Sequence, residues 1–213
     1  MRLQESKIPI LIVLAGGKSS RMGTPKGLLP YKNTCWVLEQ IQRYTLKNAF
    51  VYIGLGFNSD LYFKAIPWLE KAVKKPQRFQ GKSVQVVINK QPNLGPFSTL
   101  QSVLKQVKQQ QDILVLPIDV PLLNSVALHK IMGIHNKVVI PNCKGKNGHP
   151  VKLSYNLWKT FLTLHPFDAK SRLDVQIKQR AASEISIVKV EDCAILKNLN
   201  TPESWEMFVS QKH

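Results

Sequence analysis

The stretch Ile10-Leu-Ile-Val-Leu-Ala-Gly-Gly-Lys-Ser-Ser-Arg-Met-Gly23 decides how this chain of 213 residues is expected to fold. Its first five residues are apolar without alternation, which is typical of a strand covered on both faces of a parallel sheet. Pro9 is compatible with the position just before such a strand. The glycines that follow predict a loop at the carboxyl end of the strand, where open α/β sheets bind their ligands.

Four similar β-rich runs recur along the chain, at residues 50–53, 84–88, 113–116 and 137–140, with helix-period stretches between them. Strands that alternate with helices predict βαβ units and a mostly parallel sheet. At roughly 150 residues per domain, the length predicts one domain over residues 1–213. We therefore expect a single three-layer α/β domain.

Caps and breakers predict where the helices begin and end. Asn33 or Thr34 can cap a helix that runs to about residue 44. Ser59 can cap another helix that reaches residue 75 and breaks or kinks at Pro67. Further helices are expected at 97–107, 126–131, 156–164, 168–179 and after Pro202, and further strands at 151–153 and 185–190.

The charge of the chain is its unusual compositional feature. Thirty Lys and Arg residues against thirteen Asp and Glu leave a net charge of +17. Such an excess favours polyanionic partners: nucleic acid, an anionic membrane or phosphate-rich small molecules. The apolar content of 44% is that of a folded protein and argues against disorder, collagen and coiled coil.

The cysteines and the N-terminal residues indicate where in the cell the protein is expected. Cys35, Cys143 and Cys193 are odd in number and far apart, so we expect neither a disulfide framework nor a cysteine zinc site, and a cytoplasmic location. The apolar run from residue 10 to residue 15 is too short to cross a bilayer. Glu5 and the polar loop after the run also argue against a signal peptide, so no membrane partner is expected.

The segment over residues 14–30, LAGGKSSRMGTPKGLLP, has the residues of a phosphate-binding loop. Its glycines and serines let backbone N–H groups approach an anion. Arg21 can hold a phosphate with two N–H bonds, and Lys26 can act as a point charge. The loop is not a Walker A motif, because Ile12 stands where that motif requires a glycine, and it is not a G-x-G-x-x-G turn. A flexible, solvated basic turn is the alternative.

This loop resembles the signature of the molybdenum-cofactor nucleotidyltransferases, a Rossmann-like group of nucleoside-triphosphate transferases, approximately L-A-[AG]-G-x-S-x-R-M-G-x-[PD]-K. The resemblance covers about residues 10–205 and implies a three-layer Rossmann-like nucleotidyltransferase fold. It implies that the loop binds the nucleotide, with Arg21 on the β- and γ-phosphates and Lys26 on the α-phosphate. The matching positions are Leu14, Ala15, Gly16, Gly17, Ser19, Arg21, Met22, Gly23, Pro25 and Lys26.

Two further segments resemble motifs of the same family. Asn93-Leu-Gly95-Pro96 follows the third main strand and resembles a segment whose backbone lies close to the nucleotide, although an ordinary Gly-Pro turn would look the same. Leu116-Pro-Ile-Asp119-Val-Pro resembles the D-x-P motif, in which the Asp holds the catalytic magnesium. Mg²⁺ prefers one or two carboxylates together with phosphate oxygens. The other role open to Asp119, capping the next helix, suits Asn124 better.

The acceptor-side elements are expected at about residues 141–190. His149 lies in an N-G-H-P-V element near that side; a lone histidine is usually structural, so contact with the acceptor and a structural role both stay open. Asn200 lies in N-L-N-T-P-E, where cytidylyl-type members carry an Asp that can bind metal. An amide supplies at most a neutral oxygen, so Asp119 is the one carboxylate that the motifs assign to the metal.

The implied reaction transfers a nucleoside monophosphate to a phosphorylated acceptor and releases pyrophosphate. The motifs conflict between GTP and CTP, with a slight preference for GTP and for a molybdopterin-like acceptor. A sugar-phosphate or terpenoid-precursor nucleotidyltransferase stays an alternative, as does a non-catalytic nucleotide sensor.

A nucleic-acid-binding protein is the alternative from another class, because basic residues cluster at Lys71, Lys74, Lys75, Arg78 and Lys82, joined by Lys105 and Lys108. The absence of an aromatic-plus-basic recognition motif argues against it. The basic surface could equally serve a polyphosphate ligand or an acidic partner enzyme.

Overall fold

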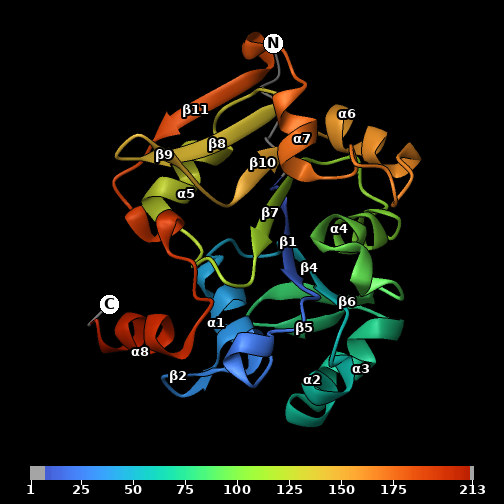
Figure 1. Cartoon of the computed structure of the whole chain (residues 1–213), viewed down its shortest axis with the longest axis vertical. Helices are drawn as coiled ribbons and strands as arrows, with labels where there is room; N and C mark the ends of the chain where they lie inside the picture. The colour runs from blue at the N-terminus through green and yellow to red at the C-terminus, as the bar shows by residue number, and fades with distance from the viewer. Residues whose placement is uncertain (1–7, 212–213) are drawn as a thin grey trace.

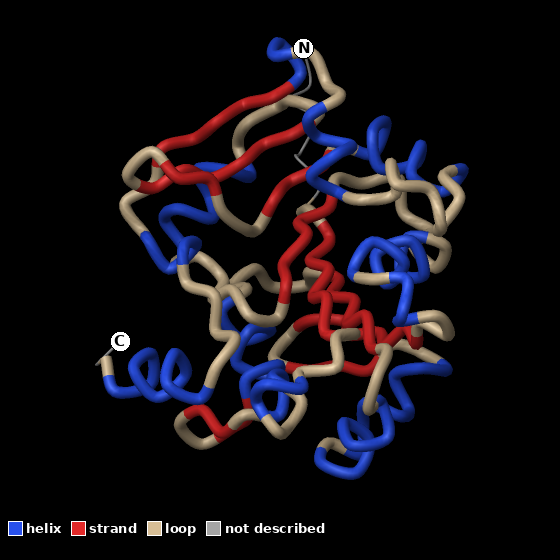
Figure 2. The backbone as a smooth tube through the Cα atoms, viewed as in Figure 1, coloured by secondary structure: helices blue, strands red, loops and turns tan. Residues whose placement is uncertain are grey.

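The computed structural model describes residues 8–211 and is organised around one twisted sheet (Figures 1 and 2). In spatial order its strands are β11 (Ile185–Lys189), β8 (Val138–Cys143), β10 (Val151–Leu153), β7 (Ile113–Pro117), β1 (Ile10–Ala15), β4 (Phe50–Leu55), β6 (Lys82–Ile88) and β5 (Gln77–Phe79). β9 (Lys146–Asn147) pairs with β8, and β2 (Pro30–Tyr31) and β3 (Thr34–Cys35) form a separate hairpin.

The sheet is mostly parallel, as predicted. β1 pairs in parallel with β4 on one side and with β7 on the other, and β6 and β11 extend the parallel direction. The register places Leu14 beside both Gly54 and Pro117, so the chain leaves β1, β4 and β7 at the same edge. The loops that follow these strands therefore meet there.

Helices cover both faces of the sheet and make the three predicted layers (Figure 2). One face of β1, through Leu11 and Val13, packs against α1 (Trp36–Arg43), α2 (Ser59–Ala65), α3 (Pro67–Lys74), α5 (Ser125–Met132) and α8 (Pro202–Ser210). The other face, through Ile10 and Ile12, packs against α4 (Pro96–Leu104), α6 (Tyr155–Trp158) and α7 (Leu173–Lys178). Both faces of β1 are buried, which explains its unbroken apolar sequence.

Several predicted element boundaries are corrected by the structure. Thr34 belongs to β3, and Cys35 occupies the N-cap of α1 without a side-chain cap, because the chain enters this helix from the hairpin. Asn58 rather than Ser59 is the N-cap of α2. The break at Pro67 is confirmed, since α3 starts there. α7 begins five residues later than predicted, at Leu173.

The strand β10 was predicted, but its antiparallel direction was not. It lies between β7 and β8 and opposes both of them. Because its direction is reversed, the residues that precede β10 lie at the edge where β7 and β1 end. The Gly148-His149-Pro150 turn reaches the ligand edge of the sheet in this way.

The prediction that the cysteines form no disulfide is wrong, because Cys143 and Cys193 are bonded to each other. Cys143 ends β8, and Cys193 begins a 3₁₀ turn, η6 (Cys193–Leu196), that packs beside it. A backbone hydrogen bond from Val190 to Asn142 brings the two segments together. The two cysteines are 50 residues apart in sequence, so the sequence alone does not indicate that they are neighbours in the fold.

No helix within residues 8–211 is both long enough and apolar enough to cross a bilayer.

Candidate active site

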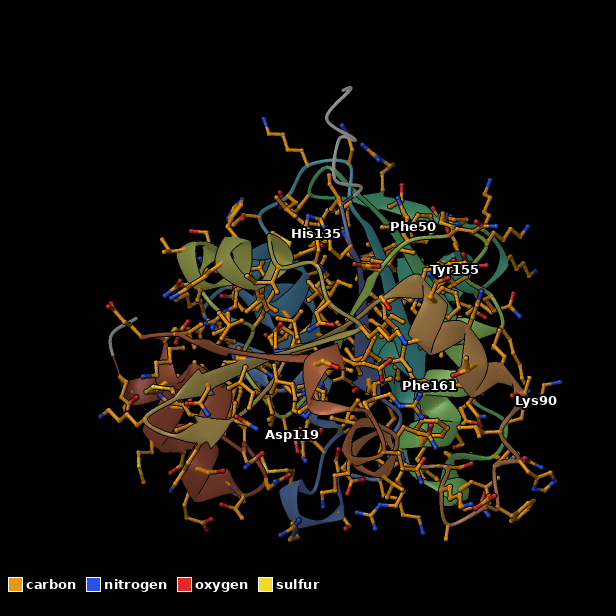
Figure 3. All side chains as sticks on the ribbon, turned by 90° about the horizontal axis from the view of Figure 1, so that it is seen from above. Phe50, Lys90, Asp119, His135, Tyr155 and Phe161 are labelled. Atoms are coloured by element: carbon orange, nitrogen blue, oxygen red, sulfur yellow. A yellow bond between two sulfur atoms is a disulfide. The ribbon has the colours of Figure 1, made fainter. Side chains whose placement is uncertain are left out.

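A cavity of about 430 Å³ opens at the carboxyl ends of β1 and β7. Asp119 lies at this end of the sheet, away from Phe50, His135 and Tyr155 at the other end (Figure 3). The walls of the cavity come from the glycine loop, from the start of α4 and from the segment after β7. The lining residues are Leu14, Gly16, Gly17, Ser19, Lys26, Pro92, Gly95, Pro96, Thr99, Pro117, Ile118, Asp119, Val120, His149 and Asn198.

The glycine loop folds back on itself through two short 3₁₀ turns, η1 (Ser20–Met22) and η2 (Lys26–Leu28). Ser19 and Gly23, on either side of η1, adopt left-handed backbone angles with φ of 53° and 68°. The Ser19 hydroxyl accepts a hydrogen bond from the Lys26 backbone N–H at 3.2 Å, which closes the loop. The loop thereby points the Lys26 side chain into the cavity.

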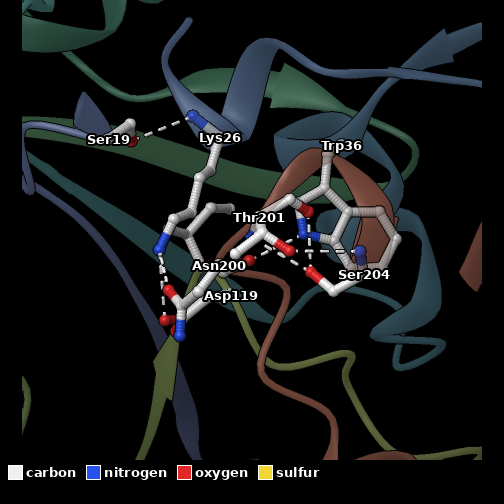
Figure 4. A network of polar contacts seen from close by, with 8 residues as sticks. Ser19, Lys26, Trp36, Asp119, Asn200, Thr201 and Ser204 are labelled. Atoms are coloured by element: carbon white, nitrogen blue, oxygen red, sulfur yellow. Dashed lines mark hydrogen bonds and ion pairs between the residues drawn. The ribbon is translucent and has the colours of Figure 1, made fainter. Parts of the chain in front are cut away.

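The Lys26 ammonium meets two oxygens from distant parts of the chain (Figure 4). Its Nζ lies 3.3 Å from Asp119 Oδ2 and donates a hydrogen bond to Asn200 Oδ1. The Lys26 and Asp119 side chains are 16% and 23% exposed, so the ion pair is only partly open to water. Lys26 follows the first strand, Asp119 follows β7, and Asn200 precedes α8, so the fold itself assembles this cluster.

The oxygens of Asp119 and Asn200 form a donor set of the kind that Mg²⁺ uses. Both accept from one cationic group, and hard divalent cations prefer oxygen ligands completed by phosphate and water. Within residues 8–211 no group of three or more His, Cys, Asp or Glu side chains could hold a metal ion. A cation held here would therefore depend on the substrate phosphates for most of its ligands.

Buried polar side chains fix the segment that carries Asp119. Trp36 Nε1 donates to the Ile118 carbonyl at 2.7 Å, and Gln40 Nε2 donates to the Val120 carbonyl at 2.7 Å. Gln40 Oε1 also accepts from the Leu122 N–H at 2.9 Å. Gln40 is fully buried in α1, so this one amide satisfies two backbone groups on either side of Pro121.

Two further contacts hold Asn200 and the segment that carries Asp119 in place. The Leu199 N–H donates to the Asp119 carbonyl at 2.8 Å, which joins the Asn200 segment to the Asp119 segment. Thr201, the next residue, forms a capping box with Ser204 at the start of α8 (Figure 4). Asn200 is therefore anchored on both sides.

Tyr62, on α2, holds the glycine loop at Gly27. Its hydroxyl accepts a hydrogen bond from the Gly27 N–H at 3.2 Å, and its burial within the core raises the pKa of the phenol. A Cβ at Gly27 would lie 2.5 Å from the Tyr62 hydroxyl, so only glycine fits beside it. The backbone next to Lys26 is thus held on both sides, by Ser19 and by Tyr62.

A second cavity of about 770 Å³ continues from the first toward α7. The two share Leu14, Gly95, Pro96, Pro117 and His149. Leu94, Phe97, Leu100, Val115, Ile140, Val151, Leu173 and Ile177 make the second cavity mainly apolar. Arg172, Asp174 and Lys178 add charge to its lining.

His149 stands where the two cavities meet. Its Nδ1 lies 3.3 Å from the Val115 carbonyl, which can only accept, so Nδ1 carries the proton and Nε2 keeps a lone pair. Burial lowers the pKa of the imidazole and favours the neutral form.

Comparison with known proteins identifies the family. Residues 11–181 match the model of the MobA-like NTP transferase domain. The chain belongs to this family. It is a nucleotidyltransferase.

This MobA-like transferase is similar in sequence to a named guanylyltransferase and in fold to solved structures. It is 25% identical over 207 residues to a molybdenum cofactor guanylyltransferase from Xanthomonas euvesicatoria pv. vesicatoria (strain 85-10), with 94% of each chain covered. Rv0371c from Mycobacterium tuberculosis H37Rv has the same fold, with a TM-score of 0.70, 20% identity and coverage of 97% and 99%. Another structure of Rv0371c, a complex with manganese, has a TM-score of 0.66, 19% identity and coverage of 96% and 100%.

The site residues predicted from sequence separate into two groups in the MobA-like transferase. The structure brings together around the first cavity Leu14, Gly16, Gly17, Ser19, Lys26, Gly95, Asp119, His149 and Asn200. Arg21, Gly23 and Asn93 are exposed and are not among the described residues that line either cavity. Ala15 is buried within β1.

The basic cluster near α3 lies outside this site. Lys71, Lys74, Lys75 and Arg78 are exposed, and none of them is among the described residues lining the two cavities. Lys82 differs from the other four residues of the cluster, because it is 4% exposed and its ammonium donates to the Gln80 carbonyl. Its burial lowers the pKa of the ammonium group.

Replacing Gln40 by leucine should destabilise the MobA-like transferase markedly. The substitution leaves the Val120 carbonyl and the Leu122 N–H without their partner in a buried place. Each unsatisfied group costs about 1–3 kcal/mol, so for the two groups we expect a loss of about 2–6 kcal/mol. Urea unfolding at neutral pH measures the difference. Gln42→Leu, at an exposed position of the same helix α1, is the control, and equal losses in both variants would contradict the anchoring role of Gln40.

Proposed function

We propose that this nucleotidyltransferase transfers the guanylyl group of GTP to a phosphorylated acceptor of the molybdopterin type and releases pyrophosphate. The observation that carries the proposal is the meeting of Lys26, Asp119 and Asn200 beside the glycine loop. The choice of GTP and of the acceptor is supported by the guanylyltransferase from Xanthomonas, at 25% identity over 94% of each chain.

In the proposed reaction a phosphate oxygen of the acceptor attacks the α-phosphorus of GTP in line. The new phosphorus–oxygen bond forms as the bond to the leaving pyrophosphate breaks, and negative charge grows on the equatorial oxygens and on the leaving group. No covalent nucleophile of the protein is required, so catalysis rests on positioning and on positive charge. The backbone at Gly16 and Gly17 and the Lys26 ammonium are suited to these tasks.

We assign the remaining roles by the same chemistry. Lys26 meets the α-phosphate, and Arg21, although exposed, is long enough to turn toward the β- and γ-phosphates. Asp119, with Asn200 as a neutral oxygen ligand, would hold Mg²⁺. The ion would supply Lewis-acid polarisation of the phosphate oxygens. The manganese complex of the Rv0371c fold relative supports a divalent ion in this family.

The two cavities suggest how one domain over residues 1–213 serves two substrates. The nucleotide would occupy the cavity beside the glycine loop, and the acceptor would enter from the α7 side. His149 lines both cavities, which supports its assignment at the junction. The acceptor-side elements at about residues 141–190 include His149 and α7.

Thermal unfolding in the presence of nucleotides tests the proposal. Purified protein is titrated with GTP, CTP, ATP and UTP, with and without Mg²⁺. Binding at a hundred times Kd stabilises a protein by about 2.7 kcal/mol. For a chain of this size we expect the midpoint to rise by about 5–10 °C with GTP and Mg²⁺. A larger shift with CTP would reassign the base, and no shift with any nucleotide would contradict the proposal.

A further inference from the structure

We infer that the Thr99 hydroxyl is a further nucleotide-binding group, which donates a hydrogen bond to an oxygen of the nucleoside triphosphate beside Gly16. The inference rests on the proposed function, because it needs the nucleotide in the cavity next to the glycine loop. Thr99 lies in the first half of α4, is 2% exposed, and lines that cavity. No sequence motif marks it.

Glycines at the ends of β1 and β4 make the space that Thr99 fills. A Cβ at Gly16 would lie 2.7 Å from Thr99 Oγ1, and a Cβ at Gly54 would lie 2.7 Å from Thr99 Cγ2. The threonine side chain is therefore seated between two strand ends, with its hydroxyl on the side of Gly16. Its position is fixed by packing before any ligand arrives.

The buried Asn89 sets the direction of the hydrogen bonds around Thr99. The Gln91 backbone N–H donates to Asn89 Oδ1 at 2.9 Å, so this end of the amide must be the oxygen. The amide nitrogen, Nδ2, therefore faces α4 and donates to Thr99 Oγ1 at 3.0 Å. The Thr99 oxygen accepts this bond, and its own proton must be donated elsewhere.

In the same network, the Ser98 hydroxyl both accepts and donates a hydrogen bond. Its Oγ accepts from Asn89 Nδ2 at 2.8 Å and donates to the Gly95 carbonyl at 2.7 Å. Thr99 accepts from the same nitrogen, but within residues 8–211 no group accepts the Thr99 proton. A buried donor at the wall of a ligand cavity is satisfied by a ligand oxygen or by water.

The chemistry of the cavity identifies the oxygen. Gly16 and Gly17 line it with backbone, and Lys26 supplies a cation, so a phosphorylated ligand is favoured at this place. A neutral hydroxyl donor suits a phosphate oxygen or a ribose oxygen of the nucleotide. Thr99 is thus assigned as the group that contacts the nucleotide, and Asn89 as the residue that positions it.

Affinity for GTP in variants of Thr99 tests this assignment. Thr99→Val keeps the shape and removes the donor, whereas Thr99→Ser keeps the donor. We expect the Kd of the Mg²⁺–GTP complex to rise about three- to tenfold in Thr99→Val and to stay near the wild-type value in Thr99→Ser. Thr45→Val makes the same substitution at an exposed position outside the residues lining either cavity; it is the control and should bind as the wild type does.

Asn89→Asp tests the direction of the network independently. A carboxylate at this position has no N–H to donate and instead accepts the Thr99 proton. We expect it to weaken GTP binding as Thr99→Val does, with thermal unfolding used to confirm that each variant is folded. Unchanged GTP affinity in a folded Thr99→Val protein would overturn the inference.

Pyrophosphate as a second ligand identifies the oxygen that Thr99 contacts. Weaker pyrophosphate binding in Thr99→Val assigns a phosphate oxygen, and unchanged pyrophosphate binding with weaker GTP binding assigns a ribose oxygen. Wild-type protein that binds none of the four nucleotides would overturn the proposed function together with this inference. Wild-type binding that Thr99→Val retains in full would overturn only the role of Thr99.

Discussion

Replacing Lys26 by alanine should lower kcat/KM about a hundred- to a thousandfold, the effect of removing one preorganised charge from a site of this kind. The Lys26 ammonium is the group on which Asp119 Oδ2 and Asn200 Oδ1 converge. Its removal takes away the cation expected at the α-phosphate. The side chain lies at a cavity wall and outside the apolar core, so the fold should survive. Release of pyrophosphate from GTP in the presence of acceptor measures the loss.

A matched substitution separates the role of Lys26 from a general effect of charge. Lys64→Ala removes one positive charge from an exposed position of α2 and should leave kcat/KM unchanged. The thermal midpoint of Lys26→Ala should stay within a few degrees of the wild type, because the Asp119 side chain left behind is 23% exposed and water can solvate its carboxylate. Wild-type turnover by a folded Lys26→Ala protein would refute the assigned role.

Asp119→Asn is expected to lower activity about a hundredfold or more and to weaken the dependence on Mg²⁺. The amide keeps the size of the side chain but removes the only carboxylate that contacts the Lys26 ammonium among the described residues. Phosphate oxygens and Asn200 would then hold the cation without a charged protein ligand. Initial rates across a wide range of Mg²⁺ and Mn²⁺ concentrations should show a higher metal requirement.

Asp60→Asn provides the control for Asp119→Asn, because it removes an exposed carboxylate in the first turn of α2. We expect it to change neither the rate nor the metal dependence. If Asp119→Asn required no more Mg²⁺ than the wild type, Asp119 would not be a metal ligand, and the carboxylate would act on Lys26 alone.

The parts of the site that were predictable lie directly after buried strands. Gly16 and Asp119 follow β1 and β7, whose apolar runs are visible in the sequence, and parallel strands deliver their carboxyl ends to one edge. The three layers were predictable for the same reason, because strand and helix periods alternate along the chain. The resemblance of the loop to the family signature added the expectation that the ligand is a nucleoside triphosphate.

The supporting residues were not predictable, because they act across long separations with no periodic signal. Gln40 is polar in an otherwise apolar stripe, and its partners lie about 80 residues away. Tyr62 is 35 residues from Gly27, and Thr99 on α4 contacts Asn89, which directly follows β6. The reversed β10 has only three residues, too few for its direction to be read from its sequence. These features belong to tertiary structure.

The Cys143–Cys193 bond restrains only the segment of the chain that it encloses. It closes a loop of 50 residues that contains His149, β10, α7 and β11, and within this loop His149 and α7 line one side of the second cavity. In the chain-entropy description, a closure of this length restricts the unfolded chain by about 4 kcal/mol. The strands that carry the glycine loop and Asp119 lie outside the closed segment. Thiol reductants should therefore loosen the side of the second cavity that His149 and α7 line before they affect the glycine loop and Asp119.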